Sequence, residues 1–164
     1  MSFQIHNDKI LNNLVIKKSL KLPLSSAIKI LSQDVPACVV SNSTIITSFS
    51  SGTLTCDTLL FTNFPTMYSS INPSRIVIPL QGVYDIKFSV LITAVSDLVA
   101  TISLAVNGQL PGTLVSKNPI VPGTDTINDS MLIQLNSNDF IEIYLITTVP
   151  ANVKVNYYSV NLIN

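Results

Sequence analysis

The sequence predicts an all-β protein: an antiparallel two-sheet sandwich of the jelly-roll type, preceded by an extended N-terminal arm. Two observations support this prediction. Residues 82–94 alternate between apolar and polar side chains, as a half-buried strand does, and a second alternating stretch follows at 99–106. Turn residues then recur at short intervals along 37–164, whereas helix patterns are nearly absent, and this combination is typical of sandwiches built from many short strands.

The composition indicates one domain with an unusually uncharged surface. The chain has 164 residues, of which 47% are hydrophobic and 11% are charged, whereas about a quarter of the residues are charged in a typical globular domain. We therefore expect much of the surface to be buried against other chains. Every long apolar stretch is interrupted by polar residues, glycine or proline, so we expect no membrane-spanning helix.

Residues 1–36 differ from the remainder and form the predicted attachment arm. Their five lysines outnumber Asp8 and Asp34 by three, so the arm carries a net charge of +3 and residues 37–164 carry −3. The lysines are mixed with aliphatic residues in a pattern that fits neither a helix nor a long strand, and Pro23 restricts its surroundings to an edge or extended conformation. We expect the arm to become ordered against another structural protein. Contact with nucleic acid or lipid head groups is the weaker alternative, because the lysines lack interleaved arginine and aromatic residues.

From Ala37 onward the pattern is strand, turn and strand to the last residue. The predicted head domain, 37–164, has candidate strands at 37–48, 53–61, 74–80, 82–94, 99–106, 113–117, 126–135, 139–148 and 152–163. Turn residues separate them at Ser51-Gly52, Asn72-Pro73, Asn107-Gly108, Pro111-Gly112, Pro122-Gly123, Ser137-Asn138 and Pro150. The apolar face of 82–94 is the predicted centre of the core, and it consists of Tyr84, Ile86, Phe88, Val90, Ile92 and Ala94.

Four segments of the head resemble a known family in their order and residue types. They are Gly82-Val83-Tyr84 running to Phe88, Ser103-Leu104-Ala105-Val106-Asn107-Gly108, Leu135-Asn136-Ser137-Asn138-Asp139-Phe140-Ile141-Glu142-Ile143, and the closing Tyr158-Ser159-Val160-Asn161-Leu162-Ile163. Over roughly residues 53–164, this order resembles the tumour-necrosis-factor-like superfamily, including the globular heads of complement. The resemblance implies a jelly-roll head that closes around a three-fold axis with two further copies.

The departures from the family pattern are specific. Pro79 lies three residues before Gly82 instead of next to it, Asn138 replaces the turn glycine, and Val160 replaces a glycine of the closing strand. Asparagine tolerates the left-handed conformation, so we expect the turn to survive. The same pattern is similar to virion fibre heads, spikes and decorations, and to small jelly-roll proteins of the bacterial spore coat. No Gly-x-y repeat precedes the head, so the resemblance does not extend to the collagen-bearing members.

The residues that enzyme chemistry requires are missing from the head. The single histidine is His6 in the arm, so neither a Ser-His-acid triad nor a histidine metal site can form within 37–164. The stretch 125–129, Asp-Thr-Ile-Asn-Asp, is a weak candidate for a calcium loop of the kind some superfamily heads carry, and turn formation is the favoured explanation. We expect no enzyme activity, cofactor or metal, and we expect Cys38 and Cys56 to be free buried thiols.

The leading hypothesis is a non-enzymatic structural protein on the surface of a particle, foremost a phage or other virion. In this hypothesis a decoration, fibre head or spike forms a homotrimer and attaches through residues 1–36. The start MSFQIHNDKI lacks the features of a secretion signal, which fits release inside a finished particle. The alternatives are a spore outer-layer protein, a soluble module that binds a host receptor or a glycan, and a small capsid shell protein whose arm faces nucleic acid.

The last two strands predict where the copies meet. In 139–148 and 152–163 apolar residues fall on both faces, whereas a strand of an isolated sandwich needs only one apolar face. We expect the second face to meet a neighbouring copy, where a tyrosine ring can be buried while its hydroxyl keeps a partner. The predicted interface consists of Phe140, Tyr144, Ile146, Tyr157, Tyr158, Val160 and Leu162.

Overall fold

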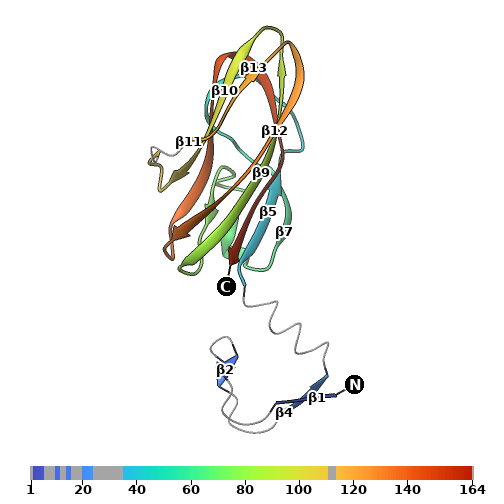
Figure 1. The fold of residues 1–164 in the computed structure, drawn as a ribbon, viewed down its shortest axis with the longest axis vertical. Coiled ribbons are helices and arrows are strands. Elements are labelled where there is room, and N and C mark those ends of the chain that lie inside the picture. The colour runs from blue at the N-terminus through green and yellow to red at the C-terminus, as the bar shows by residue number, and fades with distance from the viewer. Residues whose placement is uncertain are drawn as a thin grey trace. The chain divides into compact units, whose positions relative to one another are not determined.

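A computed structural model of the chain describes the backbone of residues 2–5, 10–11, 14–15, 20–23, 35–110 and 114–163, and the side chains of 35–110 and 120–163. The chain divides into two compact units, Met1–Val35 and Pro36–Asn164. In the first unit, β1 (Ser2–Ile5) pairs antiparallel with β4 (Leu20–Pro23), and β2 (Ile10–Leu11) pairs antiparallel with β3 (Leu14–Val15) (Figure 1). The predictions for His6 and for the lysine side chains of the arm lie outside the described residues.

The second unit, which we call the head, is built from strands. They are β5 (Ala37–Ser41), β6 (Ile46–Thr53), β7 (Thr58–Thr62), β8 (Ile76–Val77), β9 (Gly82–Ala94), β10 (Leu98–Val106), β11 (Leu114–Ile120), β12 (Gly123–Leu135) and β13 (Phe140–Ile163). The only helical element of the described residues is the short 3-10 turn η1 (Pro65–Met67). Within the described part of the chain, no helix has the length and apolar character needed to cross a membrane.

The strand bounds confirm the central prediction and correct others. β9 spans the predicted 82–94, and β10, β11 and β12 differ from their predicted bounds by a few residues at one or both ends. The predicted strand 37–48 is wrong, because the chain leaves the sheet at Asn42. The Asn42 amide group donates to the Thr55 carbonyl, and its side-chain oxygen accepts the Val155 N–H at 3.2 Å. The predicted strands 53–61 and 74–80 are too long, because β7 begins only at Thr58 and ends at Thr62, and β8 covers only Ile76–Val77.

The head strands form two sheets that share β13. The first half of β13, residues 140–147, pairs with β10, β6 and β8, and β11 lies beyond β10. β6 follows the bend of β13 and also pairs with Ala151 and Val153 of the second half. The second half, residues 151–163, pairs with β9 and β5, with β12 beyond β9 and β7 beyond β5. The predicted strands 139–148 and 152–163 are therefore parts of one long strand that passes from one sheet to the other (Figure 1). Because all these pairings are antiparallel, the head is the antiparallel two-sheet jelly roll that the sequence predicts.

Apolar side chains from both sheets fill the core of the head. The six residues of the predicted β9 core face are each at most 4% exposed, which confirms that prediction. The other sheet contributes buried residues from β10 and from the first half of β13: Ile102, Leu104, Ile141, Ile143 and Leu145. The hydroxyl of the buried Tyr84 keeps a hydrogen-bond partner, because Oη donates a 2.7 Å hydrogen bond to the Leu80 carbonyl.

A β-bulge in β13 brings the closing residues into the core. The pairing of β13 with β9 shifts register between Val155 and Tyr157, so Asn156 is an additional residue on this strand. The bulge changes which alternate side chains point inward. The residues that face the core on either side of it are each at most 2% exposed: Val153, Val155, Tyr158 and Val160. The prediction that the second apolar face of 152–163 meets a neighbouring copy is therefore wrong for the buried positions, since the head's own core accommodates them.

Two asparagines make turns at the ends of strands in the head. Asn138 has a φ of 70° and Asn107 has a φ of 54°, followed by Gly108 at 74°. These left-handed conformations suit asparagine and glycine better than other residues. The prediction that Asn138 can replace a turn glycine is confirmed.

Candidate interaction surface

The predicted interface residues lie in three different environments. Ile146 and Tyr157 are exposed, by 44% and 38% respectively. Phe140, Tyr144 and Leu162 are half-buried. Tyr158 and Val160 are buried within the chain, at 2% and 0% exposed, so their side chains are not available to a second copy and their assignment to the interface is wrong. The remaining five positions stay a prediction.

Two of the half-buried residues are covered by the head itself. The Arg75 guanidinium lies 4.2 Å from the centroid of the Phe140 ring, at a distance typical of a cation–π contact. Leu162 packs on the core beside Gly82, where an added Cβ would overlap the Leu162 Cδ1 atom. Among the predicted residues, Ile146 and Tyr157 therefore offer the largest free surfaces.

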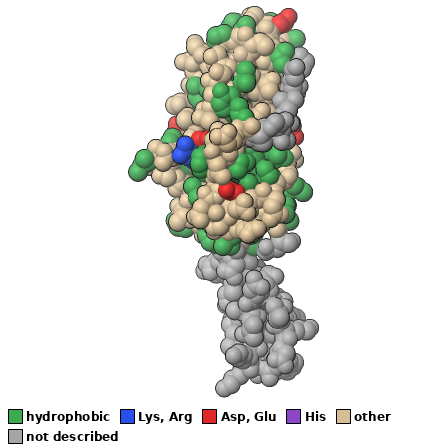
Figure 2. All heavy atoms as spheres, turned by 90° about the vertical axis from the view of Figure 1, so that its left-hand side faces the viewer, with side chains coloured by type: hydrophobic (Ala, Val, Ile, Leu, Met, Phe, Trp, Pro, Cys, Tyr) green, Lys and Arg blue, Asp and Glu red, His purple; other side chains and the backbone are tan. Residues whose placement is uncertain are grey.

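An apolar sheet edge that the interface prediction missed lies at β7. Leu59, Leu60 and Phe61 are 43%, 57% and 52% exposed, and among the described strands β7 pairs only with β5. β7 contains no charged residue or proline, which are two of the features that usually keep an edge strand from pairing with another chain, although it is short and its pairing with β5 shifts register at Leu60. The run of three apolar residues was visible in the sequence, but its edge position was not. On the other side of the head, which lies at the left in Figure 1, Figure 2 shows further exposed apolar side chains with few charged ones between them.

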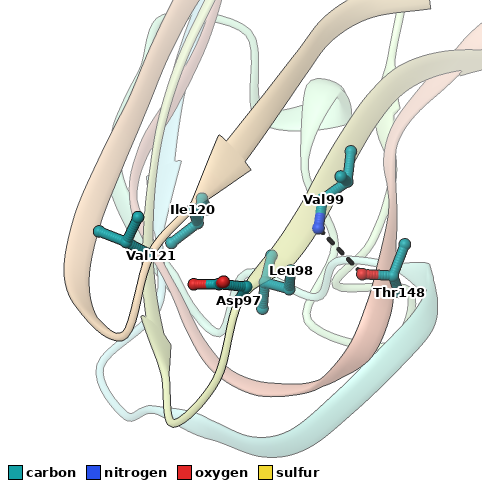
Figure 3. Close-up of a pocket in the computed structure, with 6 residues that line it drawn as sticks. All are labelled: Asp97, Leu98, Val99, Ile120, Val121 and Thr148. Atoms are coloured by element: carbon teal, nitrogen blue, oxygen red, sulfur yellow. Dashed lines mark hydrogen bonds between the residues drawn. The ribbon is translucent and has the colours of Figure 1, made fainter.

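A pocket lies at the end of the head where β10 begins, β11 ends and β13 bends. We call it the end pocket, and it is lined by Asp97, Leu98, Val99, Ile120, Val121 and Thr148 (Figure 3). Leu98 pairs with Ile120 across β10 and β11, and both side chains are buried, at 3% and 2% exposed. The Val99 N–H donates a 2.9 Å hydrogen bond to Thr148 Oγ1, which ties β10 to β13 beside the pocket. The result is an apolar hollow with polar groups at its margin.

The carboxylates of the head differ in whether they have partners. Asp85 forms a 2.8 Å ion pair with Lys87, and Glu142 forms a 3.2 Å ion pair with Arg75. Asp57 accepts hydrogen bonds from Ser43 and Thr58, which lower its pKa. Asp139 accepts from Asn107 and Asn136. These contacts hold the loops and sheet margins together.

A second pocket, more polar, lies on the outer side of β9, β12 and β13. It is lined by Lys87, Asn128, Asp129, Ser130 and Tyr157. Here the register pairs Asn128 with Ser89 and Ser130 with Lys87, so the pocket follows the surface of the sheet. Because Lys87 already pairs with Asp85, its charge is partly neutralised within the chain.

The candidate calcium stretch 125–129 belongs to a strand. These residues lie within β12, so the expectation of a loop is wrong. Asp125 and Asp129 accept hydrogen bonds from the N–H groups of the following residues, at 2.7 and 2.8 Å. Among the described residues, no group of three or more histidine, cysteine or acidic side chains is placed to hold a metal ion.

Both cysteines are free and buried in the core. Burial raises the pKa of Cys38 to about 11, against a smaller lowering by a hydrogen bond with Thr62. Burial, and to a lesser extent the nearby Asp57, raises the pKa of Cys56 to about 12. A thiol with such a pKa stays protonated at neutral pH and is a poor nucleophile. Cys38 and Cys56 therefore act as small core residues.

Comparison with known proteins identifies the fold. No protein family model matches the chain, and no curated protein sequence matches it. Among solved structures, the globular domain of zebrafish complement 1qA is similar with a TM-score of 0.60 and 14% identity, over 79% of this chain and 98% of that one. Murine APRIL is similar with a TM-score of 0.57 and 10% identity, over 79% of this chain and all of that one. Eiger TNF from S. frugiperda has a TM-score of 0.51 and 8% identity, over 79% and 93% of the two chains.

These similarities identify the fold of the head. It has the jelly-roll fold that complement globular heads and tumour necrosis factors share. The superfamily resemblance noted in the sequence is thereby confirmed at the level of fold. Domains with this fold commonly form trimers.

Proposed function

We propose that this chain is a non-enzymatic structural protein on the surface of a particle, foremost a virion. It forms a homotrimer through the head and attaches to other structural proteins through residues 1–36. The observation that carries the proposal is the exposed apolar surface of the head, which includes Leu60 at 57%, Phe61 at 52% and Ile146 at 44%. With charged residues at 11% of the chain, little charge keeps such a surface soluble in a monomer.

Trimer assembly is tested by the mass of the purified full chain. Light scattering at micromolar concentration is expected to give three times the mass of the chain. Ile146→Asp is expected to shift the mass toward the monomer, because it places a charge on an exposed interface residue. Val95→Asp is the matched control, since Val95 is 90% exposed and lies outside the predicted interface. A stable wild-type monomer would refute both the trimer and the fibre-head role.

The role of residues 1–36 is tested by removing them. A chain that begins at Ala37 is expected to fold and assemble, because the core of the head draws on residues from Cys38 to Val160. The same truncation is expected to prevent incorporation into the particle. An aggregated or unfolded truncated chain, alongside a soluble full chain, would place the arm in the core instead.

The kind of particle is tested on purified material. We expect the protein in purified virions, accessible to antibodies on the outer surface, and we expect its gene to lie near genes for a portal and a major capsid protein. Detection on spores, with expression restricted to sporulation, would favour the spore outer-layer role instead. The location on a virion surface is thus open to direct refutation.

A soluble binding module is the second candidate function, and the end pocket favours it. A hollow of this kind on an exposed end of the head can receive a receptor group or a glycan. Saturable binding on a glycan array by a chain that is absent from virions and spores would support this second function.

A further inference from the structure

We propose that the end pocket is a docking site for a partner protein and that it receives a lysine or arginine side chain from that partner. This inference goes beyond the proposed function. It concerns the head alone and holds whether the chain stands on a virion, on a spore or in solution.

The lining of the end pocket suits the aliphatic part of a long side chain. Leu98 and Ile120 form an apolar floor, and Val121, which is 73% exposed, stands at the margin. Val95, two residues before Asp97 in the sequence, adds a further exposed apolar side chain to this loop, at 90% exposed. Lysine and arginine commonly lay their methylene groups along such a surface while the charged end remains near water.

Asp97 is the feature that selects a cation. Among the residues whose side chains are described, it is the only charged one that lines the end pocket, and it is exposed. Because Leu98 pairs with Ile120, Asp97 is placed across from Val121, and Figure 3 shows its carboxylate on that side of the pocket. Every other carboxylate of the described residues accepts a hydrogen bond or forms an ion pair, whereas Asp97 does neither. Its charge is therefore uncompensated within the described part of the chain.

The charge of the surrounding loops also favours a cationic partner. In the described segments 95–98, 120–125 and 147–152, the charged residues are Asp97 and Asp125, both acidic. A basic group is attracted to this end of the head and an acidic group is repelled. Thr148 Oγ1 accepts the Val99 N–H and retains a further lone pair for an incoming ammonium or guanidinium donor. Shape and charge together therefore favour a cationic side chain with an aliphatic stem.

The test compares two short peptides that differ only in charge. Acetyl-Leu-Lys-Leu-amide and its norleucine analogue are titrated into the isotope-labelled full chain, and binding is followed by NMR. The lysine peptide is expected to give saturable shifts at the amides of Leu98, Val99 and Val121. We expect it to bind roughly two- to fivefold more tightly than the norleucine peptide, as for an exposed ion pair. Added salt should reduce that preference.

Two variants test whether the preference for the lysine peptide arises at Asp97. Asp97→Asn is expected to lower the affinity for the lysine peptide to that for the norleucine peptide, without loss of folding because Asp97 is exposed. Asp129→Asn is the matched control, because Asp129 lines the other pocket. The proposal is overturned if wild type binds both peptides equally or not at all, if the shifts cluster elsewhere, or if both variants weaken binding equally.

Discussion

The side-chain amide of Asn107 donates a 2.8 Å hydrogen bond to the Asp139 carboxylate, and this contact joins the turn after β10 to the turn between β12 and β13. Asn107 also accepts the Phe140 N–H at 3.0 Å, and Asp139 accepts the Asn136 N–H at 2.7 Å. The Asn107 side chain therefore ties the two turns together, and the Asp139 side chain also holds its own turn through the Asn136 N–H. Both residues belong to the segments by which the sequence resembles the superfamily.

Replacing Asn107 should separate its side-chain and backbone contributions. Asn107→Gly keeps access to the left-handed φ of 54° but removes both amide contacts, and we expect it to lower the free energy of unfolding by about 1–2 kcal/mol. Asn107→Ala should cost roughly 1 kcal/mol more, because alanine disfavours that conformation. Denaturant unfolding measures both values. A glycine variant as stable as wild type would show that the contacts between the turns add nothing.

The Asp139 contacts should make stability depend on pH in acid. Hydrogen bonds from Asn107 and then Asn136 hold the pKa of Asp139 below its ordinary value of 3.8. The folded chain therefore binds fewer protons than the unfolded chain, so this contribution is present above pH 3.8 and is lost as pH falls through the lower folded pKa. As the pH is lowered from about 5 to about 2, the melting temperature of Asp139→Asn should therefore fall less than that of the wild type. If the melting temperatures of wild type and variant fall equally with pH, Asp139 is not the group responsible.

Phe88→Ala should be among the most damaging single substitutions. Phe88 lies in the middle of β9 and is 2% exposed within the core. Truncation of a buried phenylalanine typically costs about 3–5 kcal/mol, because apolar contacts are lost and a cavity remains. Calorimetry or denaturant unfolding gives the change. A melting temperature equal to that of wild type would place the β9 face outside the core.

The two buried tyrosines should respond differently to loss of the hydroxyl. Tyr158 Oη is buried and has no hydrogen-bond partner among the described residues, whereas Tyr84 Oη donates to the Leu80 carbonyl at 2.7 Å. We expect Tyr158→Phe to leave the free energy of unfolding unchanged or to raise it, because it removes an unsatisfied polar group. We expect Tyr84→Phe to lower it by about 1 kcal/mol. The reverse order would show that Tyr158 has a partner in solution.

The bulge in β13 shows where reasoning from the sequence was insufficient. Alternation along 152–163 assigned Val153 and Tyr158 to opposite faces, yet both are buried. The additional residue between Val155 and Tyr157 exchanges the side chains that face the core with those that face outward. It becomes evident only when the pairing with β9 is known. The interface prediction therefore included Tyr158 and Val160, which the core already accommodates.

The candidate surfaces depended even more on long-range arrangement. The apolar run Leu59–Phe61 is plain in the sequence, but its exposure follows from the position of β7 beyond β5 at the end of a sheet. Asp97 is likewise visible as a loop residue. Only the pairing of β10 with β11 and the bend of β13 bring it together with Ile120, Val121 and Thr148.

The sequence by itself determined the fold class, the bounds and buried face of β9, and the turn at Asn138. These features follow from local rules, namely the period of two along a strand and the backbone conformations that asparagine tolerates. The tertiary structure alone decided which strands lie at sheet edges, where β13 changes phase, and which loops enclose the end pocket. Those features depend on pairing between residues far apart in the chain, and a local pattern carries no information about its distant partner.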